Sequence, residues 1–334
     1  MSGAIRESGG QRTLQCMEVW GGNRAVQNGV SMPGLDAWVF SRPWKDQPGG
    51  GDVHYVSSCA TGRITRLLVA DVSGHGEAIA GAAGSLRDLM RRYINFVDQG
   101  KFVESLNREF GARAEAGCFA TAVVATFFAP TGELAACNAG HPRPLHYSAR
   151  AGRWGFLDQP LASGGSEVAR AADDERRLVN LPLGIAEPTA YEPFSRRLRP
   201  GDLVLFYTDA MIEARGPGGR MLGEKGLLEL VGASDISSPM ALIDDVYSRL
   251  LDCCPGREPD DDVTMLLVRP NGLAPRATMR GSLAAGWRVA RGVAGGLLGR
   301  GPLPWPELSA RNILGSGIGW FNRAPGSGRG TLAE

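Results

Sequence analysis

Short apolar runs separated by turn-forming residues dominate the chain between residues 36 and 270. Runs rich in β-branched and aromatic residues predict strands; they span 36–43, 52–59, 64–73, 118–128, 134–140, 194–198, 203–209 and 262–270. Apolar residues at helical spacing predict helices; they span 77–96, 101–110, 224–231 and 239–254. Hairpin-like strand runs with helices set between them favour an α+β protein with antiparallel sheets over a βαβ arrangement.

The ends of the chain lack this pattern. Residues 1–35 show no periodicity and no apolar segment typical of a signal peptide, so they are interpreted as a flexible lead-in. Residues 149–180 are polar and irregular, which predicts a surface excursion. Residues 271–334 form a basic, Gly-rich tail, and the five glycines between 286 and 299 favour a solvated tail over an amphipathic helix. The predicted organisation is therefore a single domain at 36–270 with flexible ends.

Composition and charge narrow the class of protein. With 334 residues and 43% hydrophobic residues, the chain has material for a core and is not a wholly disordered protein. The formal net charge of +1 divides into +6 for the tail and −5 for residues 1–270, which counts against a nucleic-acid-binding domain. No apolar stretch is long enough to predict a membrane span. The six cysteines show no CxxC pair, which is typical of reduced thiols, so a cytoplasmic protein is expected.

Aspartates recur where predicted strands begin or end. Asp71 and Asp209 end two apolar runs, Asp261 and Asp262 open the last strand, and Asp52 follows three glycines. Taken alone, an aspartate in such a place is usually a turn or helix-cap residue. Taken together, the five would gather carboxylates at one edge of a sheet, where they repel one another and need cations. Oxygen ligands alone favour hard ions such as magnesium or manganese.

Seven motifs carry a resemblance to a known family. GGDVHYV, DVSGHG, FATAVVATF, NAGHPRPL, LPLG, RPGDLVLFYTDA and DDVTMLLV stand here in the order seen in metal-dependent (PPM-type) serine/threonine phosphatases. The resemblance is to the SpoIIE/RsbU-like bacterial branch, and it covers residues 36–270. It implies an αββα sandwich of two antiparallel β-sheets flanked by helices, with two divalent cations, Mn²⁺ or Mg²⁺, at one edge.

The resemblance also assigns roles to individual residues. Asp71 matches the catalytic aspartate that bridges both metals, and the Val72 carbonyl matches a ligand to one of them. Asp209 and Asp261 match the carboxylate ligands of the other metal. Asp52 matches the first acidic position, which binds metal directly or through water.

Several further residues have two readings. His75 resembles a general acid of some PPM enzymes, but its spacing from Asp71 differs, and a turn histidine is the alternative. His141 in the NAGHP run resembles a structural turn residue, and a catalytic histidine is the alternative. Asp262 resembles a residue that orients its neighbour rather than one that binds metal. Arg42 could contact phosphate, although a packing or solvated role is favoured. Ala210 replaces the usual glycine after Asp209, and its Cβ would strain the turn if that glycine has a positive φ.

The resemblance implies a protein serine/threonine phosphatase acting on a phosphorylated regulatory protein, an anti-anti-sigma (STAS-type) factor of a partner-switching pathway. One alternative is a weak or inactive pseudophosphatase that binds phosphoproteins, for which Ala210 is the support. Another is a di-metal phosphoesterase acting on nucleotides or nucleic acid. The 35 residues before Asp36 are too few for a sensory domain, so regulation is expected from a partner, homodimer formation, metal supply or the tail.

Overall fold

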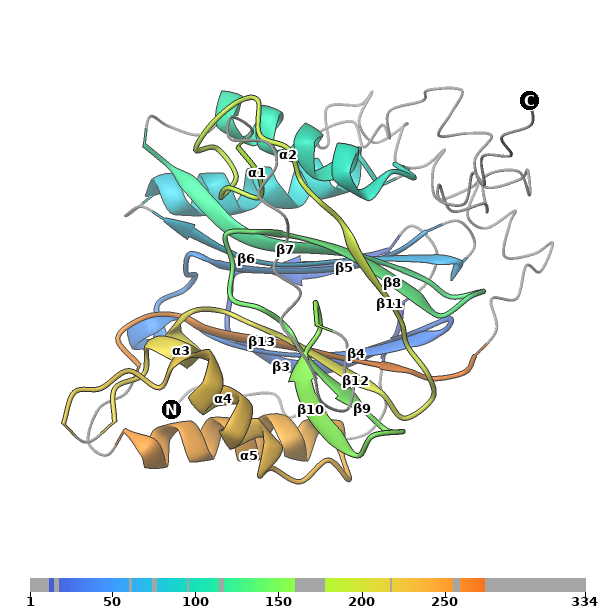
Figure 1. Cartoon of the computed structure of the whole chain (residues 1–334). Helices are drawn as coiled ribbons and strands as arrows, with labels where there is room; N and C mark the ends of the chain where they lie inside the picture. The colour runs from blue at the N-terminus through green and yellow to red at the C-terminus, as the bar shows by residue number, and fades with distance from the viewer. Residues whose placement is uncertain are drawn as a thin grey trace, which may run out of the picture.

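Two β-sheets pack face to face, and helices cover the outer face of each (Figure 1). The computed structural model describes residues 12–14, 18–59, 62–73, 77–94, 96–113, 117–159, 178–216, 218–254 and 259–273. His75 and the tail from residue 274 lie outside the described residues. This arrangement is the αββα sandwich predicted from the sequence. Within the described part of the chain, no helix combines the length and apolar character that crossing a membrane requires.

Sheet B has six strands in the order β11-β8-β7-β6-β5-β2, all antiparallel to their neighbours. Its strands are β2 (Val19–Gly22), β5 (Asp52–Cys59), β6 (Ile64–Ser73), β7 (Phe119–Phe128), β8 (Glu133–Ala139) and β11 (Phe194–Arg197). Helices α1 (Glu77–Arg92) and α2 (Gln99–Arg113) cover its outer face. Strands β5 to β7 are buried on both faces, and β7, FATAVVATFF, is accordingly a nearly continuous apolar run.

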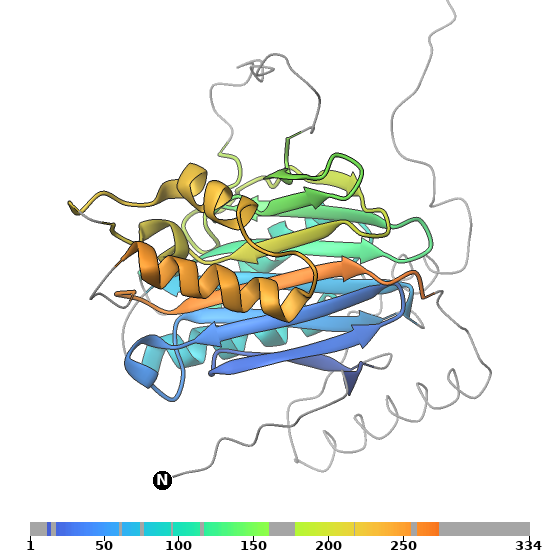
Figure 2. The ribbon, with the colours of Figure 1, turned by 90° about the horizontal axis from the view of Figure 1, so that it is seen from below.

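Sheet A has seven strands in the order β1-β3-β4-β13-β12-β9-β10, antiparallel except for the short parallel pair β1 and β3. Its strands are β1 (Arg12–Thr13), β3 (Val26–Met32), β4 (Leu35–Arg42), β9 (Leu145–Ser148), β10 (Arg153–Phe156), β12 (Leu203–Tyr207) and β13 (Val263–Pro270). The 3₁₀ turn η1 (Trp44–Asp46) follows β4. Helices α3 (Ala210–Glu213), α4 (Gly223–Gly232) and α5 (Pro239–Cys253) pack on its outer face, and α5 lies over β13 and β4 (Figure 2).

Three apolar layers hold the sandwich together. Residues of β6 show how one strand serves two of them, because successive side chains point to opposite faces. Leu67 and Val69 pack between the sheets, whereas Leu68 and Ala70 pack under α1 and α2. The third layer lies between sheet A and α3 to α5. Each sheet is therefore buried on both faces, which fixes its register.

Two predictions about irregular segments are wrong. The lead-in predicted at 1–35 contains β2 and β3, which extend both sheets, so the boundary at residue 36 divides the β3–β4 hairpin. The excursion predicted at 149–180 contains β10, which pairs with β9. These strands are short or include glycine and polar residues, so their apolar pattern is weak and long-range pairing decides their conformation.

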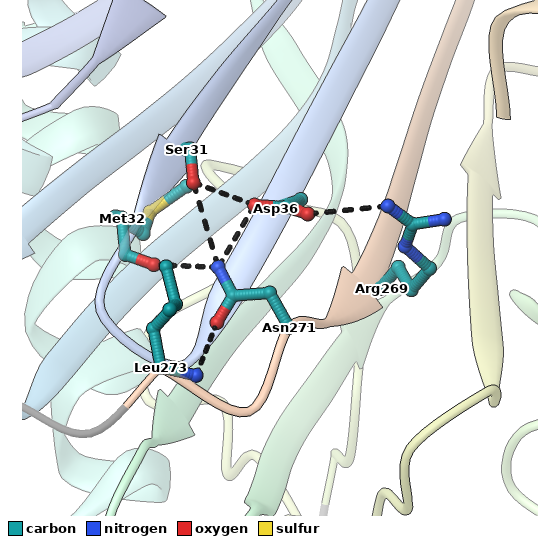
Figure 3. Close-up of polar contacts among 6 residues, drawn as sticks. All are labelled: Ser31, Met32, Asp36, Arg269, Asn271 and Leu273. Carbon is teal, nitrogen blue, oxygen red and sulfur yellow. Dashed lines mark hydrogen bonds and ion pairs between the residues drawn. The ribbon is translucent and has the colours of Figure 1, made fainter. Parts of the chain in front are cut away.

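The end of β13 is tied back to the β3–β4 hairpin (Figure 3). The Asn271 amide donates to the Met32 carbonyl at 2.9 Å and to the Asp36 carboxylate at 2.8 Å. Asp36 also accepts hydrogen bonds from Ser31 at 2.7 Å and from Arg269 at 3.3 Å. Asn271 thus belongs to the folded domain rather than to the tail predicted to begin there.

Candidate metal centre

The space between the two sheets is apolar in its middle and polar at one end. Along each strand, every second side chain points between the sheets. These side chains are apolar in the middle of the sandwich and polar at this end. The polar residues at this end are Ser41 on β4, Asp52 on β5, Asp71 on β6, Thr121 on β7, Thr264 on β13 and Thr208, which follows β12. The hydrophobic layer that joins the sheets therefore ends in a layer of hydroxyl and carboxyl groups.

On sheet B, the register brings two of the predicted carboxylates together. Asp71 is the cross-strand partner of Asp52 on one side and of Thr121 on the other. Asp52 is 3% exposed, and the Thr208 hydroxyl of the opposite sheet donates to its Oδ2 at 2.8 Å. Burial first, and then Asp71, raise the pKa of Asp52 well above its usual value.

Sheet A contributes the remaining carboxylates. Asp209 lies between β12 and α3, and Asp261 lies just before β13. Burial, followed by the charges of Asp209 and Asp261, raises the pKa of Asp71 from 3.8 to about 7. The structure thus brings Asp71, Asp209 and Asp261 within electrostatic reach of one another, as the sequence predicted.

Glu213 is a further acid that the sequence analysis missed. Besides burial, its charge is the largest influence that raises the pKa of Asp209, and it also raises the pKa of Asp71. Glu213 ends α3, and its backbone N–H donates to the Asp209 carbonyl at 2.9 Å. The four-residue spacing from Asp209 is the signal that could have revealed it, since such residues share a helix face.

Asp262 holds the glycine loop that precedes Asp52. Its carboxylate accepts from the backbone N–H groups of Trp44 and Gly51, each at 2.6 Å. A Cβ on Gly50 would lie 2.0 Å from Asp262 Oδ2, so only glycine fits there. The Asp262 N–H also donates to Asp261 at 2.8 Å. Asp262 therefore orients its neighbours, as the sequence predicted.

The residues at this end suit divalent cations. No ion pair between described residues involves Asp52, Asp71, Asp209 or Asp261. No such ion pair therefore offsets the mutual repulsion of these carboxylates. A Cβ on Gly51 would lie 2.8 Å from the Val72 carbonyl oxygen and 3.2 Å from Asp71 Oδ1, so the glycine leaves space beside these oxygens. Such an oxygen donor set fits magnesium or manganese.

Protein side chains alone do not complete the coordination. Across the described ranges, no three His, Cys, Asp or Glu side chains converge into a ready-made metal cluster. A cation bound here would therefore need the Val72 carbonyl and water as additional ligands, which magnesium in particular retains in protein sites.

Contacts within the fold account for the main chain of His141 and for one hydrogen bond of Arg42. The Asn138 side chain accepts from the His141 N–H and donates to the His141 carbonyl, each at 2.7 Å, so the NAGHP run is a structural turn. Arg42 donates to the Tyr247 hydroxyl on α5 at 3.1 Å, which is a packing role. His75 lies outside the described residues, and its role stays a prediction.

Ala210 has a conformation that suits an alanine. It begins α3, it is 5% exposed, and the preceding Asp209 has φ −64° and ψ −26°. Among the described residues, the only non-glycine positions with positive φ are Lys45 and Asn180. The strain considered for the Ala210 Cβ is therefore absent.

A cavity of about 170 Å³ opens beside the carboxylates. Its lining includes Asp261 and Glu213, together with Leu250 of α5 and Cys254, which follows α5. Its position next to Asp261 leaves room for a substrate group at the edge of the site.

Comparison with known proteins places the chain in a family. Residues 61–271, more than half of the chain, match the family model of stage II sporulation protein E (SpoIIE). The chain belongs to the SpoIIE family. The phosphoserine phosphatase RsbU of Bacillus subtilis (strain 168) is 24% identical over 236 residues, which are 70% of this chain and 63% of RsbU. The chain thus spans less than two thirds of that relative's length.

Solved structures support the same assignment. The RsbU and RsbW domains of a Mycobacterium tuberculosis protein are 25% identical, with a TM-score of 0.54 over 78% of this chain and 68% of that one. RsbX in complex with magnesium is 15% identical, with a TM-score of 0.50 over 74% of this chain and all of that one. At that lower identity, the likeness to RsbX concerns the fold alone.

Proposed function

We propose that the chain is a metal-dependent protein phosphatase that hydrolyses phosphoserine or phosphothreonine in a regulatory protein. The observation that carries this proposal is that Asp71, the cross-strand partner of Asp52, lies within electrostatic reach of Asp209 and Asp261 of the other sheet, with no described ion pair to a basic residue. In a SpoIIE-family chain related to a phosphoserine phosphatase, this set of acids is best explained as a divalent-cation site for phosphoester hydrolysis.

The chain's own residues divide the work of holding cations. Asp71 is proposed as the ligand shared by two Mn²⁺ or Mg²⁺ ions, with the Val72 carbonyl beside it and Asp209 and Asp261 on the opposite sheet. Asp52 acts through water or by position, because it is buried and one of its oxygens accepts from Thr208. When bound, such cations supply Lewis acidity and an activated water for attack on phosphorus.

The same carboxylates make the activity depend on metal. A phosphate monoester is an anion, and the clustered acids repel it when no cation is bound. The protein residues therefore reject substrate until cations reverse the local charge. This argument predicts little residual activity in a chelating agent.

The substrate proposed is a phosphorylated anti-anti-sigma (STAS-type) protein of a partner-switching pathway. Support comes from the resemblance to the RsbU branch and from the name of the RsbU relative, a phosphoserine phosphatase. The pseudophosphatase alternative depended on Ala210, and the helical conformation of that residue removes its basis. The −5 charge of residues 1–270 counts against nucleic-acid substrates.

Phosphate release from a phosphoserine STAS protein by the full chain would test the proposal. We expect turnover with Mn²⁺ or Mg²⁺, none with EDTA, and a loss of about 100-fold or more in Asp71→Asn, because a ligand is removed. Asp36→Asn, the same substitution at the far end of the sandwich, is the matched control and keeps activity. Release no greater than that of Asp71→Asn under every divalent metal would overturn the enzymatic function. Equal rates on unrelated phosphopeptides would overturn the substrate class alone.

A further inference from the structure

The side chain of His141 lies close to the predicted metal ligands. The turn described above explains the contacts of its main chain but not those of its imidazole ring. Its Nδ1 is 2.8 Å from the Thr121 hydroxyl oxygen, and Thr121 is the cross-strand partner of Asp71. The residue is 6% exposed, so the imidazole is enclosed by protein. A turn would need only the His141 backbone, whereas this side chain reaches the strand beside Asp71.

The imidazole also faces the opposite sheet. Burial lowers the pKa of His141 to about 3, and the Tyr207 carbonyl, which is near the ring, acts in the opposite direction. The ring is therefore neutral and has one donor and one acceptor nitrogen. No described atom forms a hydrogen bond of normal geometry with Nε2. Since Tyr207 is two residues before Asp209, the ring lies between the strands that lead to both ligands.

The turn that carries His141 is fixed at several points. The Asn138 side chain bonds both the N–H and the carbonyl of His141. The Tyr207 hydroxyl donates to the Arg143 carbonyl at 2.9 Å, and the Arg143 guanidinium bonds Glu224 of α4 at 2.9 Å. These contacts leave the imidazole little freedom, so it can hold the Thr121 hydroxyl in one orientation.

We propose that His141 is a positioning residue, which holds the Thr121 hydroxyl beside Asp71 at the carboxylate end of sheet B. It thereby sets the affinity of the site for divalent cations. This role rests on the proposed function, because it needs a cation bound at Asp71. Residues that support ligands in this way typically change metal affinity by 10–100-fold when they are replaced.

Calorimetric titration with Mn²⁺ tests the role without measuring activity. His141→Asn places a polar atom where Nδ1 lies, whereas His141→Gln places one where Nε2 lies. We expect His141→Asn to keep the Kd for Mn²⁺ within about 3-fold, and His141→Gln to weaken it by about 10-fold. Thr121→Val, which removes only the hydroxyl, weakens it by a similar factor. The double variant of Thr121→Val and His141→Gln loses no more than either single one, because both remove the same interaction.

Thermal unfolding of each variant, together with Asp36→Asn, separates positioning from folding. Asp36→Asn weakens a hydrogen-bond network at the far end of the sandwich, so it lowers Tm but leaves the Kd of the folded protein nearly unchanged. If the His141 variants also lower Tm with an unchanged Kd, His141 is a structural residue and the proposal is wrong. Equal Kd values for His141→Asn and His141→Gln would also overturn it. Should His141→Gln fail to fold, an unchanged Kd in Thr121→Val decides against the proposal.

The wild-type protein and Asp71→Asn distinguish this proposal from the proposed function. Wild-type binding that is lost in Asp71→Asn, with all His141 and Thr121 variants unchanged, overturns the positioning role and leaves the metal site in place. A wild-type protein that binds no Mn²⁺ overturns both.

Discussion

The two ends of the sandwich treat buried aspartates in opposite ways. At one end, Asp36 is 6% exposed and its carboxylate accepts hydrogen bonds from Ser31, Asn271 and the Arg269 guanidinium (Figure 3). At the other end, Asp71 has acids for neighbours, and burial and their charges raise its pKa to about 7. Strands β4 and β13 of sheet A run between these ends, whereas Asp71 lies on β6 of sheet B.

The difference separates a carboxylate that serves the fold from those proposed to serve a ligand. The side chains around Asp36 satisfy its carboxylate, so it stabilises the contact between β13 and the β3–β4 hairpin. The acids around Asp71 form no ion pair with a described basic side chain, so their mutual repulsion should destabilise the protein when no cation is bound. A fold usually departs from complete satisfaction of its polar groups where function requires it.

The largest effect expected from this comparison concerns metal-linked stability. Mn²⁺ at 100 times its Kd should stabilise the wild-type protein by about 2.7 kcal/mol, because the ligand binds only the folded state. Asp71→Asn should lose nearly all of this gain, whereas Asp36→Asn should keep it. Chemical unfolding of the three proteins with and without Mn²⁺ measures the difference. An equal gain in Asp71→Asn would mean that the cations bind elsewhere.

The pH dependence of the metal-free protein sharpens the contrast. A carboxyl whose pKa is higher in the folded than in the unfolded chain makes its full contribution to stability when the pH is below its pKa in the unfolded chain. That contribution is lost as the pH rises from about 4 through about 7, the folded pKa of Asp71. In EDTA, the wild-type protein should therefore lose on the order of 2 kcal/mol relative to Asp71→Asn across this range. A difference between the two proteins that does not change with pH would contradict the crowding of charge at this end.

At the far end, Asp36→Asn should lower stability whether or not metal is present. The amide keeps the shape of the carboxylate but loses the charge-assisted bond to Arg269, at a cost of about 1.5 kcal/mol. For a domain of this size, each kcal/mol lowers Tm by about 2–4 °C. Thermal unfolding with and without Mn²⁺ should give the same decrease. A decrease seen only in the presence of metal would link this network to the site.

Much of the fold could be predicted because the central strands are buried on both faces. The run at 64–73 has four consecutive apolar residues at its centre, 67–70, so its strand is evident without any partner. The strand β3 includes Gln27, Asn28 and Gly29, and only its pairing with β4 makes it a strand. Predictions from local pattern therefore work in the centre of the sheets and fail at their edges.

The site was predictable to the extent that its residues lie at strand ends. Asp71, Asp209 and Asp261 could be expected to meet because their strands lead to one edge. The contact between Thr208 and Asp52 joins opposite sheets, and the fit of Gly50 against Asp262 joins residues far apart in sequence. No periodicity encodes such contacts, since they depend on how the sheets stack.

The smallest effect belongs to Ala210, next to the carboxylates but in ordinary helical conformation. Ala210→Gly restores the motif that the family usually carries, and a strained alanine would predict a gain in both stability and activity. Because Ala210 begins α3 without positive φ, the glycine should instead cost about 0.5–1 kcal/mol and leave kcat unchanged. Chemical unfolding and phosphate release in parallel provide the measurement. A marked rise in kcat would revive the interpretation that this chain is a weakened enzyme, and would mean that the carboxylate end depends on backbone freedom as well as on charge.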